Sequence, residues 1–241
     1  QIRVDASSGV HKFSRVAYSI VNQAGLDEFA AIDLDFDPTY QKLIVHGIWL
    51  YRDGRRINYS DRSRFEVLNR ESELDLNLYS GKKTLHILLE DIRVGDSLEY
   101  SFTVVGDNPV FDGIFSFEQA FEWQVPVQDQ SLRIAWGKSN DLQFDFNDSD
   151  LEVSESYLDG YRAYSIQKKH SRARRSDSQT PSWYSPFESV YANEVDSWDE
   201  VAAWALPLYS LPETSLEVLE IAAQIKAVSS TVEDKIVLAL R

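Results

Sequence analysis

Apolar and polar residues alternate with a period of two from about Gly9 to His170. Three aspartates, for example, alternate with Ile32, Leu34 and Phe36. This period is typical of β-strands that bury one face and expose the other. The segment from Leu43 to Tyr51 is apolar on both faces, as expected of a central strand.

Turn signals separate the predicted strands at short intervals. Asp53-Gly54 leads into "RRINY", which is a strong signal for a two-residue hairpin loop. Further turns are predicted at Ser80-Gly81, Gly95-Asp96, Gly106-Asp107-Asn108-Pro109 and Asp159-Gly160. Many short strands joined in this way favour a mainly β fold. We predict an antiparallel β-sandwich, immunoglobulin-like or larger, followed by a short α-helical C-terminal segment.

The acidic segment from Leu88 to Phe111 allows two interpretations, a carboxylate site or ordinary strands with turns. After the turn at Gly95-Asp96, apolar residues alternate with polar ones from Ser97 to Val104. A slip of one residue would bury the polar set, so the register is well specified. The pattern predicts Glu99 on the solvent face. It favours a half-buried strand over a catalytic carboxylate pair.

The pattern changes after His170. The stretch "SRARRSDSQTPSWYSP" reads as an exposed linker, and helical signals follow it. Capping boxes are predicted to open three helices, at Ser197, Thr214 and Ser230, with Pro207 shortening the first. The sequence therefore predicts a sandwich domain over 1–170, a linker over 171–190 and a helical segment over 191–241. Candidates for packing the helices against the sandwich are Trp183, Tyr184, Phe187 and Trp198.

Charge and composition narrow the range of functions that the chain can have. The net charge of −15 opposes binding to nucleic acid and to an anionic membrane surface. No apolar run approaches the roughly 20 residues that span a bilayer. The 241 residues include no cysteine, so the chain has no disulfide, no thiolate nucleophile and no Cys-bound metal.

Motifs for other chemistry are weak. Asp33-x-Asp35-x-Asp37 resembles the start of a calcium loop, but Pro38 and Ile44 stand where such a loop needs Gly and Glu. The four histidines show no metal-ligand spacing. A sugar-stacking platform and core packing are alternatives for Trp49, Trp123 and Trp136, and core packing is favoured. We expect no catalytic residue, cofactor or metal ligand in this chain.

Several stretches together resemble the bacterial domain of unknown function that precedes transglutaminase-like domains. They are "YQKLIVHGIWLYRDGRRIN", "LNRESELDLNLYSGKKTLHILLEDIRVGDSLEYSFTVVGDNPVFDG" and "SWDEVAAWALPLY". The resemblance implies an extracytoplasmic (periplasmic or secreted) protein, in which a papain-related domain using Cys, His and Asp follows the β-sandwich. This chain lacks the cysteine, so no catalytic residue can be carried over.

Three functions follow as hypotheses. The first is a non-catalytic accessory sandwich for a downstream transglutaminase-like domain. On this hypothesis the chain is a fragment ending in the first helices of that domain, because the apolar residues near Arg241 need a partner surface. The second is an extracellular glycan- or peptide-binding module. The third, a hydrolase with paired carboxylates, is disfavoured because no pair stands out from strand faces and turns.

Overall fold

A computed structural model describes residues 1–5, 9–69, 81–147, 150–175, 181, 184–210, 214–229 and 231–240. The chain divides into two compact units, a β unit from Gln1 to Asp196 and a helical unit from Ser197 to Arg241. The fold is mainly β with antiparallel sheets and helices towards the C-terminus, which confirms the predicted class.

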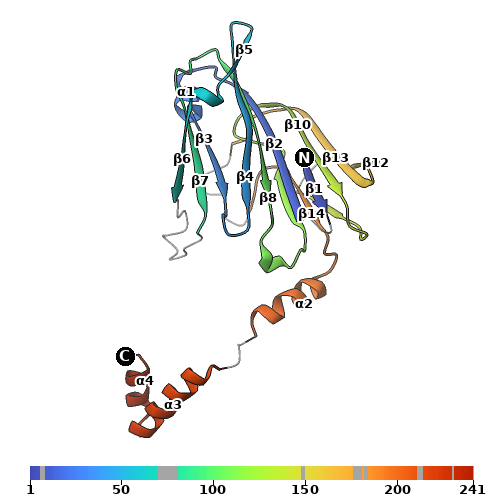
Figure 1. Ribbon diagram of the computed structural model, residues 1–241. Coiled ribbons are helices and arrows are strands. Elements are labelled where there is room, and N and C mark those ends of the chain that lie inside the picture. Colours follow the sequence, from blue (N-terminus) through green and yellow to red (C-terminus); the bar gives the residue numbers. More distant parts are fainter. Residues whose placement is uncertain are drawn as a thin grey trace. The chain divides into compact units, whose positions relative to one another are not determined.

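The described strands of the β unit form one large sheet and two small ones (Figure 1). The large sheet has eight strands in the order β12-β13-β10-β1-β2-β8-β4-β5. In chain order they are β1 (Ile2–Asp5), β2 (Gly9–Ser19), β4 (Lys42–Arg52), β5 (Arg55–Asn58), β8 (Ser97–Val105), β10 (Val127–Trp136), β12 (Ser154–Leu158) and β13 (Tyr161–Ser171).

Each small sheet has three strands. The first sheet, in the order β3-β7-β6, contains β3 (Ala31–Phe36), β6 (Ser63–Asn69) and β7 (Lys83–Leu89). The second, in the order β11-β14-β9, contains β9 (Ser116–Ala120), β11 (Gln143–Asn147) and β14 (Ser189–Asn193). Short helices connect strands at α1 (Gln23–Phe29), η1 (Ser60–Arg62) and η3 (Pro109–Phe111).

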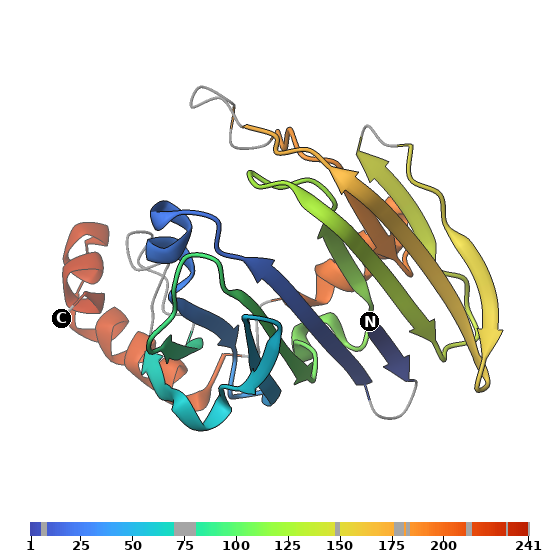
Figure 2. The ribbon, with the colours of Figure 1, turned by 90° about the horizontal axis from the view of Figure 1, so that it is seen from above.

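Both small sheets pack on the same face of the large sheet. Two separate hydrophobic cores result, one against β9, β11 and β14 and the other against β3, β6 and β7. On strand β2, Val10 belongs to the first core and Tyr18 packs against the second. These two residues are an even number of positions apart, so their side chains share one face of the strand. In Figures 1 and 2, the two small sheets lie apart from each other, at different ends of the covered face.

The opposite face of the large sheet carries neither small sheet, and we call it the open face. Its side chains are those that alternate with the core residues in each of the eight strands. Arg3, Phe13, Arg15 and Ala17 on this face are all exposed. Within the described residues of the β unit, the layers therefore form a sandwich in which neither small sheet covers one broad side.

Predicted turns are confirmed where the sequence offered Asp-Gly pairs. Asp53 and Gly54 adopt φ values of 51° and 72° in the β4–β5 hairpin. Asp159 and Gly160 adopt 51° and 85° between β12 and β13. Two residues with positive φ match the right-handed twist of the flanking strands, which is why this dipeptide sets the hairpin register.

The β unit ends later than the predicted boundary at residue 170. Strand β14 lies between β9 and β11, and its Val190 and Ala192 are fully buried in the first core. The sandwich thus includes residues that the sequence had assigned to the linker and to the helical segment. The chain leaves the sheet after β13 and returns to complete it, a long-range pairing that no local pattern reveals.

The helical unit contains α2 (Trp198–Leu208), α3 (Leu216–Val228) and α4 (Val232–Ala239). Ser197 caps α2 as predicted, whereas the caps of α3 and α4 are Ser215 and Thr231, one residue later than predicted. Pro207 lies inside α2 and near its end. The three helices have no buried residue. Among the described residues, no helix is both long enough and apolar enough to cross a bilayer.

Candidate functional site

Trp49 is held flat on the open face by its neighbours. A Cβ atom at Gly47 would lie only 2.3 Å from Cη2 of Trp49, so the indole ring lies directly over the glycine. The Arg56 guanidinium lies over the same ring, 4.5 Å from its centroid. A cation at this distance over an indole is attracted by the ring quadrupole. The ring is therefore covered by the strand backbone on one side and by Arg56 on the other.

Glu99 lies beside this stack and joins two further strands. Arg15 on β2 donates from Nη2 to Oε2 of Glu99 at 2.8 Å, and the Tyr51 hydroxyl donates to the same oxygen at 3.3 Å. The hydrogen bond from Arg15 lowers the pKa of Glu99 and outweighs its burial, and the positive charge of Arg56 adds to this effect. We call these five residues the Glu99 cluster: Arg15, Trp49, Tyr51, Arg56 and Glu99.

The sequence placed Glu99 on the solvent face, and the structure corrects this in part. The side chain does lie on the open face, but Glu99 is only 9% exposed because its neighbours cover it. Asp96, predicted in a turn, is 2% exposed and accepts hydrogen bonds from Arg52. Period two identified the correct face of the strand. The alternation could not predict the arginines that cover these carboxylates. Arg15 is 84 residues before Glu99 in the sequence, and Arg52 is 44 residues before Asp96.

Substituting Gly47 tests the geometry of this cluster. Gly47→Ala is expected to displace the Trp49 indole and to destabilise the β unit by about 1–3 kcal/mol, because the added methyl group overlaps the ring. The Trp49 indole N–H resonance in an NMR spectrum and the urea midpoint measure the two effects. Gly25→Ala is the matched control, since the nearest atom to its Cβ lies at 3.5 Å. An unshifted Trp49 resonance would contradict the stacked geometry.

A second cluster closes one end of the first core and contains two carboxylates. Glu122 accepts a hydrogen bond from Arg174 at 2.7 Å and lies 3.4 Å from the Lys168 ammonium, which also pairs with Glu188. Burial raises the pKa of Glu122, but Arg174 and Lys168 together outweigh it and lower the pKa. A general acid needs the opposite shift. This cluster clamps the chain where it leaves β13 and re-enters at β14.

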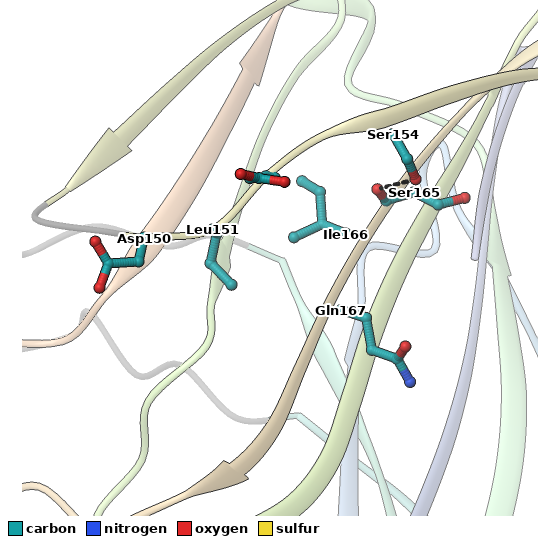
Figure 3. A pocket seen from close by; sticks show the side chains of 7 residues that line it. Asp150, Leu151, Ser154, Ser165, Ile166 and Gln167 are labelled. Carbon is teal, nitrogen blue, oxygen red and sulfur yellow. Dashed lines mark hydrogen bonds between the residues drawn. The ribbon is translucent and has the colours of Figure 1, made fainter.

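A hollow of about 440 Å³ lies at the outer edge of the large sheet, beside β12 and β13 (Figure 3). Its lining includes Asp150, Leu151, Ser154, Ser165 and Gln167. The Ser154 hydroxyl donates to the Ser165 carbonyl oxygen at 3.0 Å. No histidine, lysine or arginine lines the hollow to activate that hydroxyl. Two carboxylates, Asp150 and Glu152, also line the hollow, but the Ser154 hydroxyl donates to a backbone carbonyl oxygen and not to either of them.

The three tryptophans considered for a sugar platform do not share a surface. Trp136 is 1% exposed in the first core, and Trp49 lies on the open face under Arg56. Trp123 follows β9, and its indole donates to Gln130 at 2.8 Å. Core packing is thus confirmed for Trp136 alone.

The aspartates of the calcium-like motif have separate partners. Asp33 pairs with His86, Asp35 accepts from Thr84, and Asp37 accepts from Thr39 in a turn. Asp33 and Asp35 are exposed on β3 as predicted, whereas Asp37 is 8% exposed. In the part of the chain that the structure describes, no three His, Asp or Glu side chains gather as a metal site would require.

The four residues proposed to pack the helices against the sandwich are distributed as follows. Trp183 lies outside the described residues. Tyr184 is 49% exposed and Phe187 is half-buried, both shortly before β14. Trp198 opens α2 and is 84% exposed. Their packing role stays a prediction.

The described residues form a mainly β domain in which one face of the large sheet carries neither small sheet, and they show no recognisable catalytic constellation. The family comparison then places it. The chain belongs to DUF3857, a domain of unknown function with solved structure, whose sequence profile matches residues 6–175. The profile ends before β14, which completes the sheet. No curated protein matches the chain.

A solved structure shares the fold. It is a "putative protease" from Parabacteroides distasonis, similar with a TM-score of 0.76 at 14% sequence identity. The match covers 98% of this chain and 47% of that one. This chain therefore spans about half the length of the protein that it resembles.

Proposed function

We propose that this chain is a non-catalytic accessory module that recognises or positions a substrate for a downstream transglutaminase-like domain. The open face carries the proposal. It is broad, free of the small sheets, and holds the Glu99 cluster on four adjacent strands. Side chains that fix one another on rigid strands suit recognition, because little conformational entropy is lost when a ligand binds.

Two observations support a downstream catalytic partner. The Parabacteroides protein is described as a "putative protease", and about half of it lies outside the match with this chain. The present chain has no cysteine, so the nucleophile of a Cys-His-Asp site must come from other polypeptide. The proposal includes an extracytoplasmic location, which rests on the family resemblance.

The helical unit fits the same proposal. Its apolar side chains are exposed along all three helices, among them Leu216 at 79%, Val228 at 78% and Leu240 at 83%. Amphipathic helices of this length are stabilised mainly by packing against other elements. We propose that they belong to the downstream domain.

Turnover assays test the proposal. The purified chain is expected to show no amidase, endopeptidase or acyl-transfer turnover, because it lacks the thiolate on which the chemistry of the proposed downstream domain depends. Thiol-blocking reagent provides the control. Activity that the reagent abolishes belongs to a contaminant, since this chain has no thiol to block. Robust turnover that resists the reagent would overturn the non-catalytic assignment.

A second candidate is a binding module that acts without a catalytic partner. The Glu99 cluster favours it as well, and it favours a peptide over a glycan. Sugar rings stack on a free aromatic face, but both faces of the Trp49 ring are covered. Retention of peptide binding with no effect on any linked domain would support this candidate.

A further inference from the structure

The open face has a charge opposite to that of the chain. Nine charged side chains lie on it by strand register, and six of them are cations. The cations are Arg3, Arg15, Lys42, Arg56, Arg133 and Lys169, and the carboxylates are Asp5, Glu99 and Asp129. The face thus has an excess of three positive charges on a chain whose net charge is −15. Screening at physiological salt limits interactions to about 8 Å, so a ligand responds to the charges nearest it. At the Glu99 cluster these are two cations, Arg15 and Arg56, and one carboxylate, Glu99.

The Glu99 cluster holds two of these cations in fixed positions. Glu99 is buried and ionised, and it anchors Arg15 through one nitrogen, Nη2. Arg56 lies on Trp49 and, within the described residues, makes no hydrogen bond. A guanidinium has five N–H donors in a planar fork, so both groups keep donors for a ligand. The cluster therefore holds two guanidinium groups, those of Arg15 and Arg56, in position around one carboxylate, that of Glu99.

The geometry of a fork selects the chemistry of its ligand. Carboxylates accept two parallel N–H donors from a guanidinium, and such charge-assisted bonds are among the strongest in proteins. A glycan is disfavoured by the covered Trp49 ring.

We infer that the open face binds an acidic peptide, with side-chain carboxylates placed at Arg15 and Arg56. The inference deepens the proposed function and rests on it, since it names the substrate class that the accessory module recognises. Alternate residues of an extended peptide point to the same side. A peptide laid across the strands can therefore present carboxylates to both β2, which carries Arg15, and β5, which carries Arg56 three strands away.

Fluorescence anisotropy with labelled peptides tests the inference. The probe is a short peptide that alternates Ser and Glu, and its matched control alternates Ser and Gln. The Glu peptide is expected to bind about tenfold or more tightly, with affinity that falls as salt is added. Arg56→Gln is expected to weaken binding of the Glu peptide about fivefold to tenfold.

Two further variants separate a local effect from a general one. Arg64→Gln removes the same charge from an exposed position on β6, outside the open face, and is expected to change affinity less than about twofold. Arg15→Lys keeps the charge but loses the fork, and is expected to weaken binding. Melting curves confirm that each variant is folded.

Each contrary result has a defined meaning. Equal binding of both peptides, no binding of either, or equal weakening by Arg64→Gln and Arg56→Gln would each overturn the acidic-peptide inference. Tighter binding of an acidic oligosaccharide than of the Glu peptide would overturn it in favour of a glycan. Equal peptide binding that shifts the Trp49 resonance would remove the acidic preference and leave the recognition role intact. The turnover assay tests the non-catalytic role separately.

Discussion

A chain that ends at Arg175 is expected to lose the cooperative fold of its β unit, whereas a chain that ends at Asp196 keeps it. The shorter chain contains everything that the family profile matches but lacks β14. Each residue of β14 pairs with β9 on one side and β11 on the other. Its removal unpairs both neighbours and uncovers the first core, including Trp136.

The expected loss is large compared with the stability of a domain. Backbone hydrogen bonds contribute about 0.5–1.5 kcal/mol each, and burying a valine such as Val190 contributes about 1.5–3 kcal/mol more. A whole domain is stable by only about 5–15 kcal/mol. Circular dichroism with thermal melting measures the outcome for both lengths. A cooperative melt of the shorter chain near that of the longer one would contradict the role assigned to β14.

Replacing Asp96 is expected to cause the largest loss from a single side chain. Asp96 accepts two hydrogen bonds from Arg52, at 2.8 and 2.7 Å, and a third from the Arg93 backbone N–H at 2.8 Å. Asp96→Asn removes the charge at nearly constant volume and leaves Arg52 largely buried. Leaving a buried charge without its partner costs up to about 3–5 kcal/mol. The hydrogen bonds that Arg52 keeps with Asp91 offset part of this cost. Urea unfolding of the variant and the parent chain measures the difference.

The same pair makes stability depend on pH in a defined direction. Hydrogen bonds from Arg52 lower the pKa of Asp96, and burial acts less strongly in the other direction. A carboxyl whose folded pKa is depressed contributes stability above its unfolded pKa and loses it as pH falls through the folded pKa. The difference in unfolding free energy between Asp96→Asn and the parent chain should therefore be largest near neutral pH. It should shrink in acid, below about pH 4.

A neighbouring aspartate is the matched control. Asp53 is exposed at the β4–β5 turn, and Asn tolerates its positive φ of 51°. Asp53→Asn is expected to change stability by less than about 0.5 kcal/mol at any of these pH values. If the loss of unfolding free energy in Asp96→Asn did not change with pH, the shape of Asp96, and not its charge, would be what stabilises the fold.

The sequence predicted what local patterns determine. Alternation placed Leu98, Tyr100 and Phe102 against the core, and Asp53-Gly54 fixed a hairpin. The larger of the two sandwich sizes considered matches the eight-stranded sheet. These features depend on neighbours within a few residues, so the physical forces that set them can be read from short segments.

Local patterns could not predict which strands pair when they are far apart in the sequence. β1 pairs in parallel with β10, more than 120 residues later, and β14 inserts between strands far earlier in the chain. The Glu99 cluster also depends on this assembly, since its members come from four strands. One local signal could have predicted the position of Trp49. Gly47, two positions earlier on the same strand face, leaves space for the indole ring.

The width of the large sheet determines how much of the open face one ligand can reach. Adjacent strands rotate by about 20–25°, so seven steps from β12 to β5 accumulate roughly 140–175°. Strand β5, which carries Arg56, is thus turned well away from β13, which carries Lys169 next to the opposite margin. A stiff ligand can contact only one margin at a time, whereas a pliable chain can wind across both.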